Sequence, residues 1–262
     1  MKRAPRWVGA AVLAAAWIGA CTDVGTSPDG IVALAFDTLP YPALVAFDTM
    51  RDSSGRAAPL RAVAYNADGN VIENPPVRYI ALDTGVDISS QGYLIASTRT
   101  SGTVRVVATA AALQSLQKTV TVTRPPSAFA ASGATVDTLK YTSPDSATNV
   151  SKAMTVKLTR DSAGTAIGVP GFIVSWQATY HGQPVPPGDT TLLSLWDDSR
   201  RVAVLDTTGG DGVAARTLRF RSTAFRAVND SIIVSASTRY RGAPVAGSPV
   251  KFVIHLRPKP VR

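Results

Sequence analysis

Short apolar runs with a period of two constrain the fold of this chain more than any other feature. Val, Thr and Ile dominate the runs, and Gly, Pro, Asp or Asn separate them. The clearest runs are RAVAY at 61–65, VRYIA at 77–81, TVRVVA at 103–108, TVTVT at 119–123, MTVKLT at 154–159, FIVSWQAT at 172–179, RTLRFR at 216–221, SIIVSA at 231–236 and VKFVI at 250–254. Because successive side chains of a strand point to opposite faces, the pattern predicts an all-β sandwich or barrel.

One segment departs from this pattern. Residues 108–118 (ATAAALQSLQK) have helical propensity. Strong strand signals flank the segment on both sides, so an extended hairpin is the better prediction.

The two halves of the chain repeat each other loosely. A turn at 67–69 precedes the aromatic Tyr79 in the first half, and a turn at 161–164 precedes Trp176 in the second. Glycine in such turns accepts a positive φ without penalty, which suits hairpins. An aromatic on a central strand fills the space between two packed sheets. The repeat predicts two tandem sandwiches, with Pro125–Pro126 as a semi-rigid linker.

The N-terminal segment has the pattern of a secretory signal. Lys2, Arg3 and Arg6 precede Trp7–Ala20, which contains no charge. A helix of that length spans about 21 Å, less than the roughly 30 Å of a bilayer core. Residues 1–20 are therefore predicted to be a signal peptide and not a permanent membrane span.

The end of this segment, Ile18-Gly19-Ala20-Cys21, resembles the lipobox of bacterial lipoproteins. The resemblance implies that Cys21, the single cysteine of the chain, carries diacylglycerol and becomes the acylated amino terminus. Several acyl chains anchor a protein stably, whereas one does not. Residues 21–30 would then be a lipidated tether. The alternative is an ordinary signal peptide cut after Ala20, with Cys21 a free thiol.

Residues 31–124 resemble a bacterial immunoglobulin-like domain of the group 2 type. The matching stretches are AVAYNADGNV at 62–71, VRY at 77–79, GYLIA at 92–96, GTVRV at 102–106 and VTV at 120–122. Tyr79 stands where the family usually has Trp. Residues 127–257 resemble a second, more divergent immunoglobulin-like domain, in which DGVA at 211–214 is similar to the invasin/intimin type. The resemblance implies stalks, spacers or adhesive modules on bacterial surfaces, and it carries over no catalytic residue.

The residues themselves give little support to catalysis or metal binding. The chain has two histidines, His181 and His255, and lacks the common nucleophile, phosphate-loop and zinc-protease motifs. One cysteine excludes a Cys-rich zinc site. Asp197–Asp198 and the 206–211 loop contain oxygen ligands, but Asp side chains that cap turns explain them better. We therefore expect no enzyme, no cofactor and no metal.

The formal charge of +9 lies in the signal segment, the second half and the basic tail at 258–262. On the run at 216–221, alternation puts Leu218 and Phe220 on one face and Arg219 and Arg221 on the other. These two arginines form either a basic patch or a solvated strand face, which other basic residues could join: Arg200, Arg201, Arg226, Arg239, Arg241, Arg257, Lys259 and Arg262. A patch would bind an anionic glycan or another surface protein. Nucleic acid is not expected, because the fold signature offers no aromatic stacking platform.

Trp176 and Trp196, the two tryptophans outside the predicted signal peptide, receive different predictions. Trp176 follows Ile173 and Val174 on a strand and is predicted to lie in the core. Trp196 lies in the 180–200 region, which fits no family pattern, and is the better candidate for an exposed aromatic. Tyr180 belongs to the same region. Loops on a rigid sandwich carry most binding functions, so we expect any ligand site here.

Together these features predict a lipid-anchored protein of the bacterial envelope, more at the outer membrane than the inner, that acts as a structural or adhesive immunoglobulin-like module. The alternative is a carbohydrate-binding accessory module for a secreted hydrolase, which requires an exposed Trp196. A secreted hydrolase in its own right would need His181 or His255 beside a carboxylate and a nucleophile.

Overall fold

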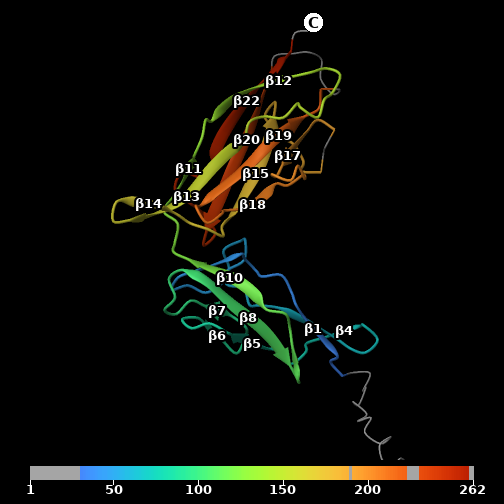
Figure 1. Cartoon of the computed structure of the whole chain (residues 1–262), viewed down its shortest axis with the longest axis vertical. Helices are drawn as coiled ribbons and strands as arrows, with labels where there is room; N and C mark the ends of the chain where they lie inside the picture. The colour runs from blue at the N-terminus through green and yellow to red at the C-terminus, as the bar shows by residue number, and fades with distance from the viewer. Residues whose placement is uncertain (1–29, 189–190, 223–229, 260–262) are drawn as a thin grey trace, which may run out of the picture.

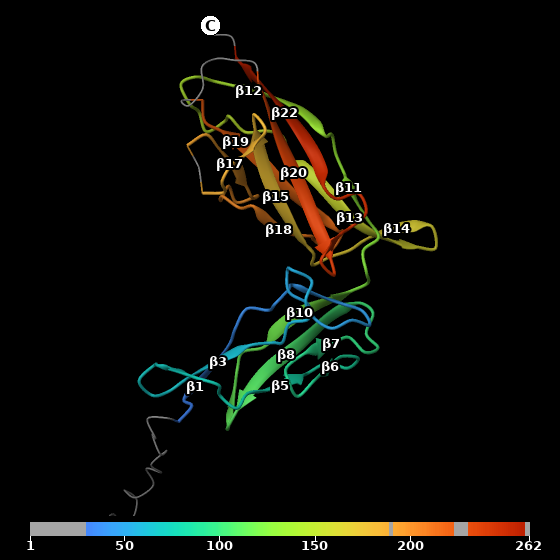
Figure 2. The ribbon, with the colours of Figure 1, turned by 180° about the vertical axis from the view of Figure 1, so that it is seen from behind.

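The structure, a computed structural model, describes residues 30–188, 191–222 and 230–259. The signal segment, Cys21 and nearly all of the tether lie outside these ranges, as do the last three residues of the basic tail. Within them, no helix is long and apolar enough to cross a membrane. The described elements are strands, which confirms the all-β class, and they form two sandwiches stacked end to end (Figures 1 and 2).

The first sandwich is built from short strands. One sheet has the order β1-β3-β4, a second has the order β2-β10-β8-β5 with β9 paired to β8, and β6 pairs with β7. The strands are β1 (Ala33–Phe36), β2 (Ala43–Val45), β3 (Ala62–Tyr65), β4 (Val71–Ile72), β5 (Arg78–Ala81), β6 (Asp87–Ile88), β7 (Leu94–Ile95), β8 (Gly102–Ala110), β9 (Leu113–Gln114) and β10 (Lys118–Thr123).

The second sandwich has longer strands and broader sheets. One sheet has the order β11-β13-β19-β17, with β14 on β13, and the other has the order β12-β22-β20-β15-β16, with β18 and β21 at its margins. The strands are β11 (Ala128–Ala131), β12 (Val136–Tyr141), β13 (Met154–Ser162), β14 (Thr165–Gly168), β15 (Ile173–Tyr180), β16 (Gln183–Pro184), β17 (Leu193–Trp196), β18 (Leu205–Thr207), β19 (Val213–Phe220), β20 (Asp230–Tyr240), β21 (Ala243–Pro244) and β22 (Val250–Pro258). Since β22 runs to Pro258, the expected tail begins inside this strand.

The strand order of the second sandwich is that of an immunoglobulin domain. In chain order β11, β13, β17 and β19 take the places of A, B, D and E, while β15, β20 and β22 take those of C, F and G. An additional edge strand, β12, runs parallel to β22. The first sandwich repeats this arrangement, because β2 runs parallel to β10 and the order continues through β8 to β5. The loose repeat seen in the sequence is therefore a repeat of topology.

Each sandwich has a hydrophobic core of its own. Leu44, Met50, Leu94 and Val104 are fully buried in the first core. The second core is richer in aromatic side chains: Phe129, Tyr141, Phe172, Trp176, Phe220 and Phe252. Trp176 is 2% exposed and stacks on Phe252 at 6.0 Å between ring centroids, so its predicted core position is confirmed. Tyr79, its counterpart, is half-buried and meets Phe36 edge to face.

The local predictions for the turns and the hairpin are confirmed. Gly69 and Gly164 have φ of 80° and 81°, in the turns that join β3 to β4 and β13 to β14. Residues 108–114 form a short hairpin of β8 and β9 with Ala111 at its tip (φ of 50°), residues 115–117 lie outside the strands, and β10 begins at Lys118. Pairing with β8 decides against the helical propensity of this segment, because Leu113 and Gln114 pair with Ala110 and Thr109 in the ladder.

Candidate functional site

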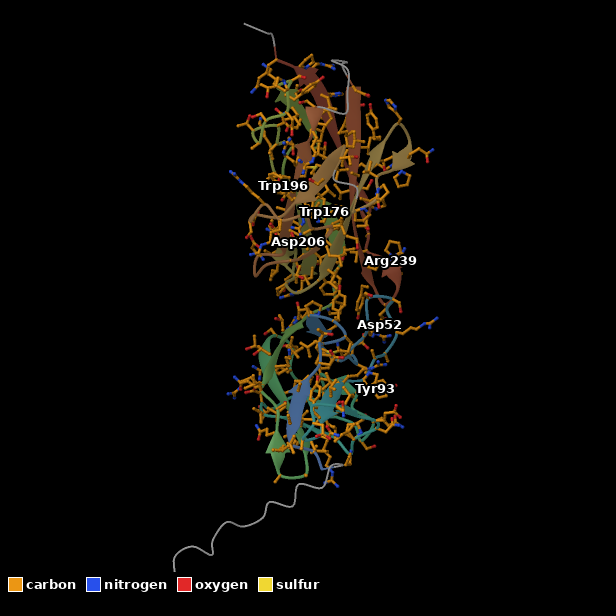
Figure 3. All side chains as sticks on the ribbon, turned by 90° about the vertical axis from the view of Figure 1, so that its right-hand side faces the viewer. Asp52, Tyr93, Trp176, Trp196, Asp206 and Arg239 are labelled. Atoms are coloured by element: carbon orange, nitrogen blue, oxygen red, sulfur yellow. The ribbon has the colours of Figure 1, made fainter. Side chains whose placement is uncertain are left out.

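The candidate binding residues of the sequence fall on the second sandwich. Trp196 ends β17, Arg200 and Arg201 lie in the turn after it, and Arg219 lies on the neighbouring β19. Figure 3 shows Trp196 well away from the junction of the two sandwiches, where Arg239 and Asp52 lie. Tyr180 ends β15 of the opposite sheet, so it does not join Trp196 in one site.

A groove of about 430 Å³ runs beside Trp196. One wall comes from the loop before β13 and the other from the turn after β17. The lining residues are Ala147, Thr148, Val150, Trp196, Asp197, Asp198, Arg200 and Thr217. An aromatic ring, two carboxylates, a guanidinium and two hydroxyls therefore meet in one concave surface.

Arg219 lies under this groove, and its position corrects the expectation of a solvated arginine face. The alternation on β19 is confirmed for Leu218 and Phe220, which point into the core. Arg219 points away from the core, as expected, but it is only 4% exposed. Its guanidinium lies 5.8 Å from the centre of the Trp196 ring and 2.6 Å from a carboxylate oxygen of Asp145. The loop before β13 covers it, so Arg219 is a structural cation and not part of a surface patch.

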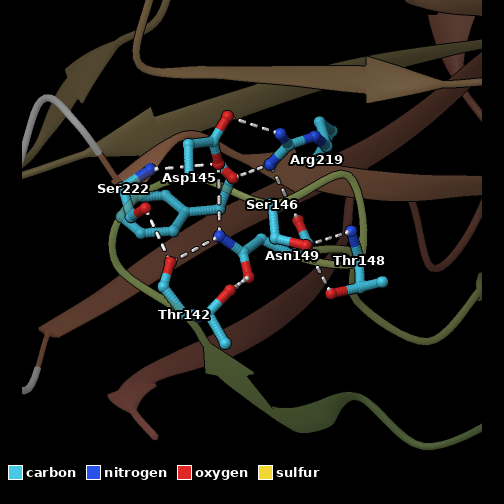
Figure 4. A network of polar contacts seen from close by, with 8 residues as sticks. Thr142, Asp145, Ser146, Thr148, Asn149, Arg219 and Ser222 are labelled. Carbon is cyan, nitrogen blue, oxygen red and sulfur yellow. Dashed lines mark hydrogen bonds and ion pairs between the residues drawn. The ribbon is translucent and has the colours of Figure 1, made fainter. Parts of the chain in front are cut away.

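A polar network holds that loop in place (Figure 4). The amide of the fully buried Asn149 donates to the carbonyl of Thr142 and to Asp145, and its oxygen accepts from the Thr142 N–H at 2.8 Å. The Ser222 hydroxyl donates to the same Thr142 carbonyl. Burial raises the pKa of Asp145, but the hydrogen bond and charge of Arg219 outweigh burial, so the pKa lies below its ordinary value. Asp145 is therefore held as a carboxylate beside the buried cation.

The turn after β17 is a capped hairpin. The Asp197 carboxylate accepts from the Arg201 N–H at 2.8 Å, and the Arg200 N–H donates to the Asp197 carbonyl. Arg200 has φ of 60°, and its side chain is exposed, as are those of Asp198 and Arg201. Asp197 thus has the turn-capping role that the sequence favoured over a calcium ligand.

The other acidic loop also caps turns. Asp206 accepts from the Thr207 and Ala215 N–H groups, and Asp211 accepts from the Val213 N–H. Asp206 also pairs at 2.7 Å with Arg216, whose side chain is 5% exposed and faces the interior of the sandwich. Arg216 lies on the same face of β19 as Leu218 and Phe220, as the alternation of the run requires. Across the described ranges, no cluster of three or more metal-ligating side chains is found.

Tyr180 belongs to a separate cluster at the end of the second sandwich. Its hydroxyl donates to Asp230 at 2.6 Å, and His181, in the turn with φ of 48°, lies 2.8 Å from the same carboxylate. Burial and the Asp230 charge raise the pKa of Tyr180. Burial raises the pKa of Asp230, but hydrogen bonds from Tyr180, Ser231 and His181 bring it below its ordinary value. The His181 ring is thus hydrogen-bonded to the Asp230 carboxylate.

The arginines expected to form one basic surface are dispersed. Arg221 is half-buried beyond the end of β19, where its N–H donates to the Leu192 carbonyl. Arg239 lies at the junction of the sandwiches, and Arg241 there binds a carboxylate. Arg226 lies outside the described residues. The described arginines therefore do not gather into one patch around Arg200 and Arg201.

The junction of the two sandwiches is the second notable region, and the sequence did not predict its contacts. The Tyr41 hydroxyl accepts from the Ile173 N–H at 2.8 Å, and its ring packs edge to face on Phe172 at 5.8 Å. Burial raises the pKa of Tyr41 to about 12, although the Ile173 hydrogen bond lowers it. Val45 of the first sandwich belongs to the core of the second. The contact is therefore apolar at its centre.

An ionic contact surrounds this centre. Asp48 is 7% exposed and pairs with Arg51 of its own domain and with Arg241 of the other, each at 2.9 Å. Burial raises the pKa of Asp48, but the hydrogen bonds from Arg51 and Arg241 outweigh it and lower the pKa to about 2. A Cβ atom at Gly55 would lie 2.0 Å from the Gly242 nitrogen, so the two backbones are in close contact. The contact is closely packed beside Asp48, where the cavity is about 30 Å³, and open clefts of about 570 and 590 Å³ flank it between the two sandwiches.

No known protein family matches the sequence, and no curated protein matches it either. Among solved structures, the Yersinia pseudotuberculosis adhesin InvE is 10% identical, with a TM-score of 0.32 over 86% of this chain and 58% of that one. The Escherichia coli adhesin FdeC is 16% identical, with a TM-score of 0.26 over 85% and 62%. Domains 1–6 of the surface layer protein SbsC are 11% identical, with a TM-score of 0.29 over 88% and 28%. This chain thus spans less than two thirds of each of these structures, to which it is only distantly similar.

Proposed function

We propose that this chain is a non-catalytic lipoprotein of the bacterial envelope, anchored through Cys21, that holds an adhesive or structural module at a fixed distance from the membrane. The observation that carries the proposal is the packed junction between the two sandwiches. This junction has an apolar centre, a buried carboxylate between two arginines and a close backbone contact. Such a junction resists bending, whereas a small polar interface permits domain motion.

The direction of the chain supports the same proposal. The described chain begins at the free end of the first sandwich, and its C-terminus lies at the far end of the second (Figure 1). A lipid at Cys21 would therefore leave the second sandwich farthest from the membrane. The polar network around Arg219 and the groove at Trp196 lie on that distal domain. The first sandwich then acts as a spacer, and the second presents the contact surface.

The anchor is tested by metabolic labelling. Cells that express the full chain are supplied with a radiolabelled or alkyne-tagged fatty acid, and the protein is then isolated. We expect label on the wild type and none on Cys21→Ser, because the thiol is the acceptor of diacylglycerol. Density-gradient separation of the membranes should place the wild type in the outer-membrane fraction and release Cys21→Ser from it.

The matched control is Ser54→Ala, a substitution of one exposed side chain that leaves Cys21 in place. It should be labelled like the wild type. Label on both the wild type and Cys21→Ser, or on neither, would contradict the lipoprotein proposal.

A further inference from the structure

We infer that the groove beside Trp196 binds a neutral sugar residue of a glycan, with the indole ring as its stacking platform. The inference supplies a ligand class for the adhesive role and rests on the proposed function for the exposure of the distal domain. It identifies one site on the second sandwich, and four observations support it.

The first observation is a fixed aromatic platform. Trp196 is half-buried at the edge strand β17 and lines the groove. The Arg219 guanidinium lies 5.8 Å from the ring centre, within the range of a cation–π contact. Asp145 fixes that guanidinium through a 2.6 Å ion pair. The ring is therefore held before any ligand arrives, which reduces the entropy lost on binding. An apolar sugar face stacks on such a ring.

The second observation is the mixture of donors and acceptors around the ring. Sugar hydroxyls both donate and accept hydrogen bonds. The exposed Asp198 carboxylate accepts, the exposed Arg200 guanidinium donates, and the Thr148 and Thr217 hydroxyls do both. A few polar groups placed around an apolar surface are the usual composition of a small-ligand site.

The third observation is the charge of the groove. Asp197 and Asp198 accompany Arg200, the one cation of the groove lining, while the exposed Arg201 lies outside the lining and Arg219 is buried and paired with Asp145. The lining thus carries no excess of positive charge. A uronate, sulfate or phosphate would meet two carboxylates for one guanidinium. The groove therefore favours a neutral sugar over the anionic glycan that the overall charge of the chain suggested.

The fourth observation is size and place. The groove volume of about 430 Å³ lies within the range of small-ligand sites. Its walls are a loop tied down by Asn149 and a hairpin capped by Asp197. Rigid walls keep the distance between the polar groups and the ring constant, which specific recognition of a sugar requires.

The experiment uses soluble protein of residues 22–262 and a panel of polysaccharides. The neutral probes are dextran, mannan, soluble starch and xyloglucan, and the acidic probes are alginate, polygalacturonate and heparin. Binding is measured by affinity electrophoresis and by the change in tryptophan emission. Only Trp176 and Trp196 remain in this chain, so the difference from Trp196→Phe isolates the groove signal.

We expect binding to a neutral probe that is unchanged between low and high salt. Trp196→Ala should weaken it by about tenfold or more, through loss of the stacking surface. Thr217→Val and Asp198→Asn should weaken it less, and Trp196→Phe should retain part of it. The matched control is Phe47→Ala, which removes a 69% exposed aromatic from the first sandwich and should bind like the wild type. Circular dichroism and thermal unfolding identify any variant that has lost its fold.

Three results would overturn the inference: binding to no neutral probe, binding that survives Trp196→Ala in a folded variant, or binding to acidic probes alone that disappears with salt. None of these results depends on whether Cys21 is labelled by fatty acid. Failure of the sugar site and failure of the anchored-spacer proposal are therefore separate outcomes.

Discussion

The two sandwiches share a strand order but differ in what fills and covers it. The first has short strands, a largely aliphatic core and few buried polar groups. The second has an aromatic core and buries two arginines, one facing the interior and one beneath a loop. A larger apolar core tolerates the cost of buried charge, provided that each charge is paired. The same topology thus holds a largely aliphatic core in one copy and an aromatic core with buried, paired charges in the other.

The comparison predicts its largest effect at the central aromatics. Trp176→Ala should lower the free energy of unfolding of the second domain by about 3–5 kcal/mol, because it opens a cavity against Phe252. Tyr79→Ala should cost the first domain less, about 2 kcal/mol, since Tyr79 is only half-buried. Urea unfolding followed by circular dichroism checks both variants. An equal or larger loss of stability for Tyr79→Ala would mean that the first domain depends on its central aromatic as much as the second does.

A second prediction compares an ion pair in each domain. Asp145→Asn leaves the Arg219 guanidinium buried without a counter-charge and should cost about 2 kcal/mol. Asp83→Asn removes the partner of Arg105. The two side chains form a solvent-exposed ion pair, with 2.9 Å between a guanidinium nitrogen and a carboxylate oxygen. That change should have no measurable effect, because water replaces the lost interaction. Thermal unfolding of the two variants provides the measurement, and equal shifts in melting temperature would remove the distinction between the domains.

A third prediction concerns the contact between the domains, where the expected effect depends on pH. The pKa of Asp48 is about 2 in the folded chain, below its ordinary value of 3.8. The junction gains stability from this group above the ordinary pKa, and the gain is lost as pH falls towards 2. Small-angle scattering should show a wider range of domain orientations at pH 2.5 than at pH 7.

Asp48→Asn is the control for this effect. It should give the loosened scattering profile already at pH 7 and should change less on acidification. A variant that stays as extended as the wild type at both pH values would show that the apolar contact of Tyr41, Val45 and Phe172 suffices to fix the junction.

Sequence reasoning succeeded where a local pattern carries the information. Alternation on each run gave the inner faces of the strands, as for Leu218 and Phe220, and glycines with positive φ marked the hairpin turns. Strong flanking strands correctly outweighed the helical propensity of 108–118. Trp196, predicted to be an exposed aromatic, is half-buried at the end of β17, and the groove beside it needs a second wall from 147–150 that the strand pattern does not indicate.

Arg219 and Asp48 show what only the tertiary structure decided. Alternation states that Arg219 points away from its own core, but it cannot state that the 142–149 loop lies over that face and supplies Asp145. Asp48 pairs with Arg241, which lies 193 residues later in the chain, and no local pattern in the sequence links them. Successive side chains of a strand point to opposite faces because of the backbone geometry, so the sequence alone indicates on which side of the sheet a residue lies. What covers that side, and which charges it brings, depends on chain segments brought together only by folding.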